Sequence, residues 1–460
     1  MLSLFDTATG RVEPLETRDD GQVSMYICGP TVYGDPHLGH GRFALVFDVL
    51  RRYLEFAGND VDHVSNITDI DDKIIERAAR EGRTEADVAD EYEKVWWEAM
   101  DGLGVLRPTE VPHATSWVEE MIQLIQGLVT RGIAYETSDG VYLLVEGVEG
   151  YGLLKHQSLD SLRAGERVEV NEDKRSPLDF ALWKKAKPGE PTWDSPWGPG
   201  RPGWHTECVV MSLGLLGDDF DLHGGAIDLI FPHHENERAQ AIAMGRAFAR
   251  HWVHNGWVMS GGEKMSKSIG NVSSLTDLVR RGDGRAYRLL VLQAHYRKPM
   301  EVTEATLGQA TGSLERLDAL ARRFELPTRV EQGTAEAVIA SGADSTAVES
   351  FRARMDDDLD TVSAAAQLFE LVTAANAAAD RGEGDTALEI ASTVQALFGV
   401  LGLEIGGHEE HLDDEVRSLV SERDEARRTK DWARADQIRD KLASRGWVVE
   451  DGPQGTQLHR

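Results

Sequence analysis

Short apolar segments alternate with helical segments near the start of the chain, and this alternation constrains the fold more than any other feature. Residues 23–28 (VSMYIC) predict a buried strand, and a Gly/Pro-rich turn joins it to a helix over 42–56. A second strand is expected over 62–68 and a second helix over 71–80. Strand, helix, strand, helix is typical of a parallel sheet with crossover helices, which predicts an α/β fold.

The alternation stops near residue 115 and returns near residue 203. We interpret residues 116–202, which contain a predicted helix, a strand-like stretch and a loop rich in Pro, Gly and Trp, as an insertion. The insertion would split the sheet domain into residues 1–115 and residues 203–260. The second half is expected to add a strand over 220–222, a helix over 235–244 and a strand over 252–259.

The C-terminal part is expected to be mainly helical. Residues 261–304 would connect the sheet domain to a helical bundle over 305–405, in which the polar segment 329–345 is predicted to be a mobile connection. A last unit over 406–460 is predicted to have two helices and a short strand over 447–450, giving it an α+β character.

The chain is strongly acidic. The 460 residues include 79 Asp and Glu against 49 Lys and Arg, which gives a net charge of −30, and only 12 of the basic residues are lysines. This balance argues against nucleic-acid binding over the whole surface, because phosphate binding depends on Lys and Arg. Many acidic groups with few lysines favour a halophilic protein whose self-repulsion is screened by salt; an ordinary acidic enzyme is the alternative.

The compartment can also be predicted. The chain has two cysteines, which argues against a disulfide-built secreted scaffold and for a reducing interior. No apolar run approaches the roughly 18–20 residues of a membrane helix, and the N-terminus does not have the pattern of a signal peptide. We therefore expect a cytoplasmic location and no membrane partner.

The segment HLGH, residues 37–40, lies at the turn between the first strand and its helix. A helix N-terminus presents backbone N–H groups and a partial positive charge, which suits phosphate, and imidazoles add further donors. Gly39 would keep the backbone open for a nucleotide. A simple helix cap is the equally weighted alternative.

The segment KMSKS, residues 264–268, follows a predicted strand and a Gly-containing turn. Lys264 and Lys267 on such a loop could neutralise a triphosphate as pyrophosphate leaves. A solvated basic loop is the alternative, and it is weakened by the scarcity of lysine elsewhere. HLGH and KMSKS together, in this order, resemble the paired signatures of class I aminoacyl-tRNA synthetases.

A third set of residues has the chemistry of zinc ligands. Cys28 ends the first strand, Cys208 lies in GWHTEC, and His233 and Glu237 are four residues apart in FPHHENE. Two thiolates, an imidazole and a carboxylate form a plausible zinc set. The alternatives are two buried inert cysteines or a disulfide.

Longer segments extend the resemblance to the whole chain. ICGPTVYGDPHLGH, NITDIDDKII, PGWHTEC, HGGAIDLIFPHHENE, KMSKSIGN and the terminal KDWARADQIRD are similar to those of cysteinyl-tRNA synthetases. This resemblance implies a Rossmann-like catalytic domain split by an insertion, then a stem-contact region, a helical bundle and a small anticodon-binding unit. It implies that ATP and cysteine form cysteinyl-adenylate and that the cysteinyl group passes to the terminal ribose of tRNA(Cys).

The resemblance assigns one zinc ion to Cys28, Cys208, His233 and Glu237, although the chemistry alone does not decide between His233 and His234. Zinc would select a cysteine thiolate over a serine hydroxyl, so no editing site would be needed. Because four protein ligands normally close a zinc site, we expect one of them, Glu237, to be long or labile.

Further roles follow from the matching motifs. The resemblance places Thr31, His37, Gly39 and His40 at ATP, with Lys267 rather than Lys264 at its phosphates and Mg²⁺ accompanying the nucleotide. Asp228 would hold the adenosine or the ammonium group of the amino acid. Thr68 and Trp204 would line the cysteine pocket together with Cys28, although simple core packing is an equal alternative for Trp204.

The C-terminal unit is expected to bind the anticodon. An exposed aromatic ring can stack an unpaired base, and carboxylates can accept hydrogen bonds from base amino groups. The candidates are Arg427, Trp432, Asp436 and Asp451. The alternative is that Trp432 belongs to a small core of its own.

Two other functions compete with this interpretation. A related ligase that joins activated cysteine to an aminosugar in mycothiol synthesis would keep the zinc set and both signatures but would lack the anticodon unit. A synthetase-like RNA-binding protein without catalysis would not need intact signatures. We expect the aminoacylating enzyme, acting as a monomer.

Overall fold

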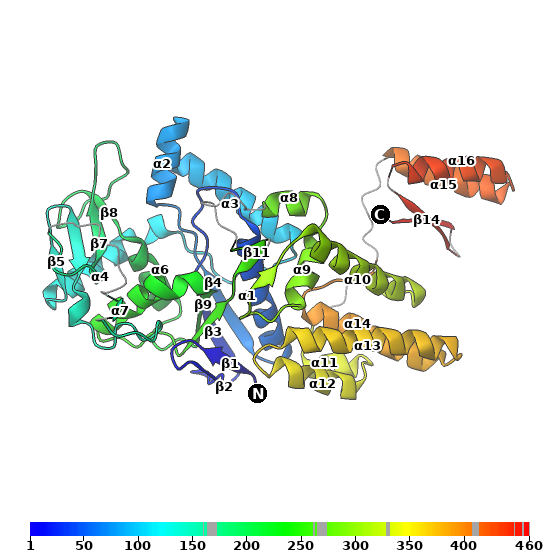
Figure 1. The fold of residues 1–460 in the computed structure, drawn as a ribbon, viewed down its shortest axis with the longest axis horizontal. Coiled ribbons are helices and arrows are strands. Elements are labelled where there is room, and N and C mark those ends of the chain that lie inside the picture. The colour runs from blue at the N-terminus through cyan, green and yellow to red at the C-terminus, as the bar shows by residue number, and fades with distance from the viewer. Residues whose placement is uncertain are drawn as a thin grey trace.

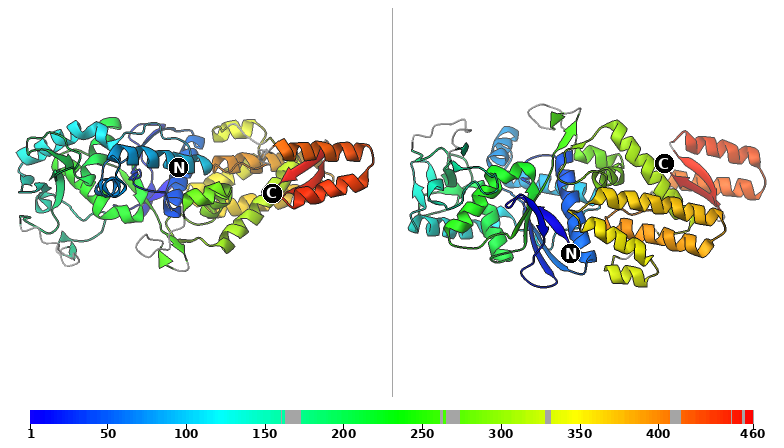
Figure 2. Two further views of the ribbon diagram at one scale, coloured as in Figure 1. Left: turned by 90° about the horizontal axis from the view of Figure 1, so that it is seen from above. Right: turned by 60° about the horizontal axis from the view of Figure 1, so that its bottom comes forward.

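The computed structural model describes residues 1–159, 161–162, 173–260, 263–264, 274–327, 332–406, 414–445, 447–452 and 455–459. Figure 1 shows a parallel sheet in the middle of the molecule, an insertion at one end and a helical bundle at the other. The C-terminal unit lies beyond the bundle, and both views in Figure 2 keep this order. The α/β prediction is confirmed.

The central sheet has four parallel strands in the order β10-β9-β3-β4. Their bounds are β3 Gln22–Ile27, β4 Asp60–Ser65, β9 Leu222–Ala226 and β10 His251–Asn255. The chain therefore enters the sheet in two separate halves, as expected from the insertion. Because β3 and β9 are neighbours, the carboxyl ends of strands from both halves meet at one edge of the sheet.

Helices connect and cover these strands (bounds: α1 Leu38–Phe56, α2 Asp72–Glu81, α3 Glu85–Gly102, α6 Trp204–Leu215, α7 Glu235–Ala243). Side chains cap three of them, since His37 caps α1, Asp71 caps α2 and Thr84 caps α3. Gly82 ends α2 in the left-handed region, with φ of 64°. Two short strands precede the sheet and pair as a hairpin (β1 Ser3–Asp6, β2 Arg11–Pro14).

The insertion contains a four-stranded antiparallel sheet in the order β5-β6-β7-β8, next to α4. The bounds are α4 Val118–Thr130, β5 Ala134–Glu136, β6 Gly140–Leu143, β7 Phe180–Lys185 and β8 Gly200–Pro202. Its apolar side chains share one core with α6 and α7, and Trp183 is fully buried in it. The insertion is therefore joined to the second half of the sheet domain by side-chain packing as well as by chain connection.

The single strand expected over 252–259 is in fact two strands, so that prediction is wrong. The chain breaks after β10 at Gly256 and continues as β11, Val258–Ser260. The amide of Gly256 donates to the carbonyl of Tyr296, and a Cβ at Gly256 would lie 2.7 Å from the Lys298 carbonyl oxygen. β11 leaves the parallel sheet and pairs with β12, Glu263–Lys264, and with β13, Met300–Glu301.

Helices follow, beginning with α8 and α9 next to the sheet and continuing as a bundle. Their bounds are α8 Leu275–Arg280, α9 Gly284–Leu292, α10 Glu304–Arg323, α11 Ala335–Ala340, α12 Ser345–Met355, α13 Thr361–Asp380 and α14 Gly384–Val400. The mobile connection expected over 329–345 is contradicted in part, because α11 lies within it and Thr334 caps that helix. Residues 328–331 lie outside the described residues.

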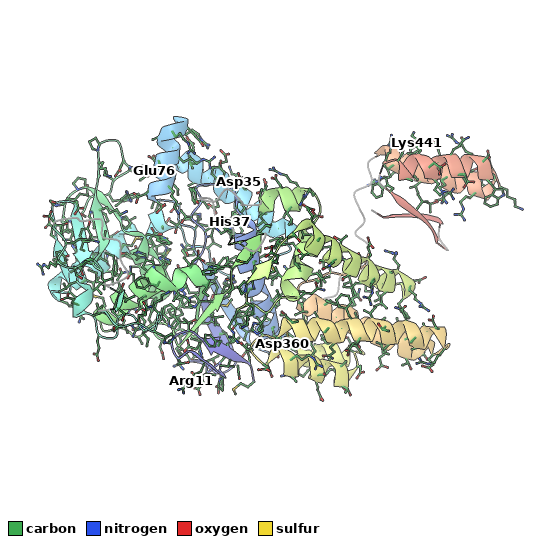
Figure 3. All side chains as sticks on the ribbon, in the orientation of Figure 1. Arg11, Asp35, His37, Glu76, Asp360 and Lys441 are labelled. Atoms are coloured by element: carbon green, nitrogen blue, oxygen red, sulfur yellow. The ribbon has the colours of Figure 1, made fainter. Side chains whose placement is uncertain are left out.

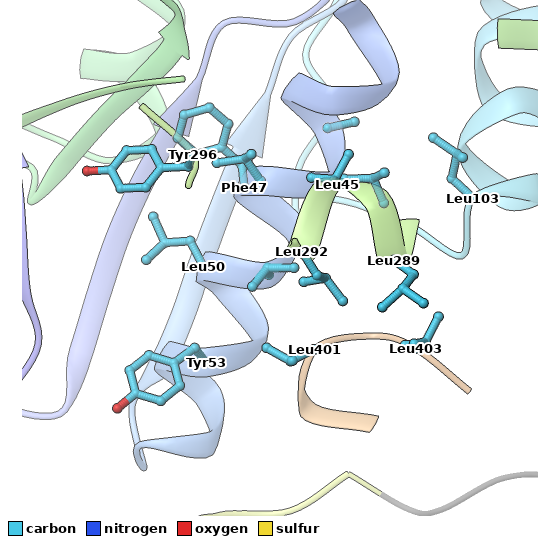
Figure 4. Close-up of a cluster of buried hydrophobic side chains, with 14 of the residues drawn as sticks. Leu45, Phe47, Leu50, Tyr53, Leu103, Leu289, Leu292, Tyr296, Leu401 and Leu403 are labelled. Carbon is cyan, nitrogen blue, oxygen red and sulfur yellow. The ribbon is translucent and has the colours of Figure 1, made fainter. Parts of the chain in front are cut away.

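The bundle is fixed to the sheet domain by a shared core. Figure 4 shows Leu45 of α1 beside Leu289 and Leu292 of α9, with Leu401 and Leu403 nearby, while Leu50 and Tyr53 project from the other side of α1; all belong to one core. Beneath this contact the Asp48 carboxylate pairs with Arg52 and Arg288, and all three side chains are buried.

The C-terminal unit has two helices and a hairpin, with bounds α15 Asp414–Arg428, α16 Trp432–Ala443, β14 Val448–Gly452 and β15 Gly455–His459. Its small core is separate and consists of Val416, Leu419, Ile438, Leu442 and Trp447. Among the described residues, the structure contains no helix with the length and apolarity needed to cross a membrane.

Candidate active site

A cavity of about 390 Å³ opens at the carboxyl ends of β3, β9 and β10. Residues after β3, from Cys28 to Thr31, form one side of it, and residues 255–258 after β10 form another. The start of α1 contributes His37, Gly39 and His40. This is the position at which ligands bind in open parallel sheets. A larger hollow of about 560 Å³ lies between the insertion and α7, and none of the predicted ATP or metal residues lines it.

The two histidines of HLGH form a reciprocal cap at the start of α1. The Nδ1 atom of His37 accepts from the His40 amide at 3.3 Å, and Nδ1 of His40 accepts from the His37 amide at 3.2 Å. Their rings stack with centroids 3.8 Å apart. Because both Nδ1 atoms accept, each neutral ring carries its proton on Nε2. The capping alternative and the ligand role are therefore compatible, since each ring keeps a second donor at a site lined by helix N–H groups.

Four buried side chains meet behind the Cys28 wall of the cavity. Cys28 comes from the end of β3, Cys208 from α6, and His233 and Glu237 from the turn into α7 and from α7 itself. One ligand atom from each lies within 4.8 Å of all the others. The Sγ atoms are 3.6 Å apart, Cys28 Sγ is 3.5 Å from Glu237 Oε1, and His233 Nε2 is 3.0 Å from that same oxygen.

Two of these separations, 3.6 Å and 3.5 Å, fit a tetrahedral zinc set, and the 3.0 Å between His233 Nε2 and Glu237 Oε1 is slightly shorter than such a set requires. Zn–S and Zn–N or Zn–O bond lengths imply ligand-to-ligand edges of roughly 3.3–3.8 Å. Burial raises the pKa of the Cys28 thiol well above its usual range, and the neighbouring Cys208 and Glu237 raise it further. A divalent cation among these groups would offset that cost and favour the thiolates. The donor chemistry therefore fits zinc better than a set of inert thiols.

Two neighbouring histidines contact members of the proposed ligand set. His223 Nε2 lies 2.7 Å from Glu237 Oε2, and His205 Nδ1 lies 2.9 Å from His233 Nδ1. Burial lowers the pKa of His205 to about 3, so this ring is neutral. If His233 uses Nε2 as a ligand, its Nδ1–H donates to His205, which fixes the orientation of the His233 ring.

The choice between His233 and His234 has a geometric basis. His234 belongs to a second possible donor set with Cys28, His223 and Glu237. Its Nδ1 atom contacts His254 Nε2 at 2.8 Å. The set with His233 includes both thiols, and thiolates are the stronger zinc ligands. We therefore favour His233.

Four of the other predicted site residues lie at the cavity surface. Thr31, Gly39, Asp228 and Trp204 line the cavity. Trp204 is 37% exposed and stacks on the His233 ring at 3.9 Å, so the core-packing alternative does not describe it. Gly39 is required locally, because a Cβ there would lie 2.9 Å from the His37 ring.

Thr68 lies beneath the cavity wall and is buried. Its amide donates to the Pro30 carbonyl, and its hydroxyl donates to Glu207 Oε2 at 2.8 Å. Burial raises the pKa of Glu207 well above its usual range. Lys264 lies in β12, opposite Met259, and Lys267 lies outside the described residues.

The anticodon candidates share the C-terminal unit, which Figure 3 places far from His37, with Lys441 marking it. Trp432 and Asp436 are one turn apart on α16, and both are exposed; Trp432 is 58% exposed. The alternative that Trp432 forms a core is wrong, because that place is taken by Trp447. Arg427 lies on α15, and Asp451 lies in β14 opposite Thr456.

Sequence reasoning missed several residues of the site. Asn66 accepts from the Gly29 amide, lies 3.8 Å from Cys208 Sγ and donates to Thr68. Lys73 and Trp257 line the cavity, and His205 and His223 contact the metal set. Four of these residues lie within motifs already singled out, namely Asn66, Lys73, His205 and His223. The sequence alone did not indicate that their side chains contact the site.

Three protein families match the chain. The class I (C) tRNA synthetase catalytic domain matches residues 14–312, a DALR domain matches 350–405, and the anticodon-binding domain of cysteinyl-tRNA ligase matches 409–458. The cysteine–tRNA ligase of Brevibacillus brevis is 44% identical over all of this chain and 99% of its own length. That of Chromobacterium violaceum is 45% identical over the whole of both chains.

The chain belongs to the cysteine–tRNA ligase family. Its fold is also similar to methionyl-tRNA synthetase of Mycobacterium tuberculosis, solved with methionyl-adenylate. That structure has a TM-score of 0.60 at 15% identity and covers 87% of this chain and 94% of its own. At this identity the likeness concerns the fold alone, and it supports the class I architecture expected for a cysteine–tRNA ligase.

Proposed function

We propose that this chain is a cysteine–tRNA ligase that forms cysteinyl-adenylate from cysteine and ATP and then charges tRNA(Cys). The observation that carries the proposal is one cavity lined by both the HLGH helix start and Cys28, behind which Cys208, His233 and Glu237 complete the metal set. Family membership over the full length supports it. The start of α1 suits a nucleotide, and the Cys28 wall suits a thiol.

In the first step a carboxylate oxygen of cysteine attacks the α-phosphorus of ATP. The bond from that phosphorus to the β-phosphate bridging oxygen breaks, and pyrophosphate leaves. No proton must be removed from the attacking group, so catalysis consists of positioning and charge stabilisation. The Nε2–H groups of His37 and His40 are suited to donate to phosphate oxygens. We assign the departing phosphates to Lys267, with a weaker role for Lys264, and expect ATP to arrive with Mg²⁺.

The amino acid would be held at the Cys28 wall of the cavity. Zinc, bound by Cys28, Cys208, His233 and Glu237, would supply a cation that prefers a thiolate to a hydroxyl. Trp204 covers the His233 ring and faces the cavity, where it would limit the size of the side chain admitted. Asp228, exposed at the rim, would receive the ammonium group or the adenosine.

In the second step a hydroxyl of the terminal ribose of tRNA(Cys) attacks the cysteinyl carbonyl carbon, AMP leaves with the bonding electron pair, and the hydroxyl proton passes to the departing phosphate or to water. Trp432 and Asp436, with Arg427 and Asp451, would contact the anticodon. We expect the chain to act as a monomer in the cytoplasm, and the two free buried thiols support a reducing compartment. The C-terminal unit argues against the mycothiol-pathway ligase, and the metal set argues against a protein without catalysis.

Cysteine-dependent pyrophosphate exchange, with serine as the comparison, tests the first step. Exchange with cysteine and none above background with serine is expected; equal exchange would contradict the metal-based selection. Charging of tRNA transcripts tests the second step. Transcripts with the cysteine anticodon should be charged, and transcripts with a changed anticodon should show a higher KM. Exchange without charging of any transcript would favour the aminosugar ligase.

A further inference from the structure

Arg42 is a buried cation just after the HLGH segment, and it faces backbone carbonyls. It lies on α1 two residues beyond His40 and is 1% exposed. Its Nη1 donates to the Trp257 carbonyl at 2.6 Å. Its Nη2 contacts the carbonyl oxygens of Tyr296 at 3.1 Å and His295 at 3.2 Å, and also that of Lys298. One guanidinium thus connects α1 to two other segments.

Those two segments form one wall of the nucleotide cavity and its support. Residues 255–258 line the same cavity as the start of α1. Residues 295–300 lie behind them, since the Gly256 amide donates to Tyr296 O at 2.8 Å and the Met300 amide donates to Trp257 O at 2.9 Å. Two of the carbonyls that Arg42 binds, those of Trp257 and Tyr296, therefore also accept these wall-to-support bonds. The guanidinium lies where the wall, its support and the histidine helix meet.

The contact is unusual because no carboxylate among the described residues pairs with Arg42. Burial lowers its pKa to about 10, and the nearby Tyr287 is the other group that acts on it. Arg288 is equally buried, but it pairs with Asp48. A buried cation held only by carbonyl groups becomes unfavourable if those hydrogen bonds are lengthened or bent, because nothing else offsets its removal from water. The Arg42 contacts therefore favour one separation between α1 and the 255–258 wall.

We infer that Arg42 is a positioning residue that sets the distance between the 255–258 wall and the histidines of α1, and so the fit of the adenosine part of ATP. This inference rests on the proposed function for the identity of the nucleotide. Arg42 itself does not line the cavity; it acts through Trp257 and Gly256 on one side and through its own helix on the other.

Arg42→Lys is the informative variant. An ammonium group keeps the charge but offers its donors from one point, so it cannot hold the Trp257 carbonyl and the 295–298 carbonyls together. We expect KM for ATP in cysteine-dependent pyrophosphate exchange to rise about tenfold or more, because small misplacements of a binding wall are costly. KM for cysteine and the zinc content should stay within about twofold of wild type.

Arg288→Lys is the matched control, because it changes a second buried arginine that also binds carbonyls but lies at the bundle contact. It should lower the melting temperature without raising KM for ATP. An unchanged KM for ATP in Arg42→Lys, or an equal rise in both variants, overturns the inference. If wild type itself shows no cysteine-dependent exchange, the proposed function fails, and the next measurement still tests the wall.

Hydrogen exchange of the wild-type chain gives that measurement and needs no variant to fold. The amides of Gly256 and Met300 should exchange slowly without nucleotide and change little when ATP is added, because Arg42 already fixes the wall. Fast exchange in the free protein, with protection appearing only on addition of ATP, would show a wall ordered by the ligand and would overturn the inference.

Discussion

One oxygen of the Glu237 carboxylate lies 2.7 Å from Nε2 of His223. The other oxygen faces the ligand set, 3.0 Å from His233 Nε2 and 3.5 Å from Cys28 Sγ. One carboxylate oxygen therefore contacts His223, and the other is available to a cation bound among the ligands. An amide brings no negative charge to the cation, and it keeps the His223 contact only if its NH2 donates to that ring in the other tautomer.

Glu237→Gln should therefore weaken zinc binding by about 10- to 100-fold. Chelator competition followed by metal analysis measures this. Glu235→Gln is the control, because Glu235 is equally buried on the same helix but bonds the Leu154 amide. Equal zinc affinity in both variants would remove Glu237 from the ligand set.

Cys208→Ala should abolish cysteine-dependent pyrophosphate exchange and lower bound zinc, because it deletes one of the two thiolates. Ser212→Ala, one turn further along α6, is the control; Ser212 is buried, and its hydroxyl donates to the Val209 carbonyl of its own helix. Its exchange rate and zinc content should match wild type. Retention of full exchange by Cys208→Ala would refute the metal hypothesis.

The sequence was enough to predict the split sheet and to place a candidate site at its edge, because both depend on motifs with local physical meaning. A strand followed by the HLGH turn and a helix places the start of that helix at a sheet edge. This prediction needs only the local sequence. The meeting of Cys28 with Cys208 could not be derived from spacing, since they are 180 residues apart, and came from resemblance alone. Tertiary contacts decide such proximity.

The errors have the same origin. The break at Gly256 depends on Tyr296 and Lys298, which are distant in sequence, so a local pattern predicted one continuous strand. Helix α11 was missed because its six residues are too few for a clear period, although Thr334 gives it a cap. His223 and Asn66 act through contacts that no sequence period encodes.

Acid should destabilise the protein partly through His63. This ring is buried in β4, and burial, with the nearby Arg51, lowers its pKa to about 3. The unfolded chain, with an ordinary pKa near 6.5, binds the extra proton below that pH, so stability falls as pH drops from about 6.5 towards 3. His63→Phe should remove about 2 kcal/mol of the stability lost between pH 7.5 and pH 5. Urea unfolding at both pH values measures the difference, and equal losses in both proteins would contradict the prediction.

Trp432→Ala should raise KM for tRNA(Cys) about tenfold while leaving pyrophosphate exchange unchanged, because base stacking is worth roughly 1–3 kcal/mol. Trp432 is 58% exposed, so the variant should melt like wild type. Trp447→Ala, which empties the small core of the same unit, should lower the melting temperature of that unit instead. Unchanged charging kinetics in Trp432→Ala would exclude this ring from the tRNA contact.

The charge of −30 predicts that folding and activity need salt. Exposed ion pairs such as Arg381 with Glu383 contribute little to folding stability, and salt screens them. Salt also screens the repulsion among the excess carboxylates, and this gain in stability should exceed the loss from the ion pairs. The melting temperature should rise between 0.1 M and 2 M KCl. Salt also weakens phosphate contacts, so the dependence of KM for tRNA on KCl should be shallow if stacking and shape supply most of the binding. A sharp, reversible melt at the same temperature in dilute buffer, with full turnover there, would identify an ordinary acidic enzyme instead.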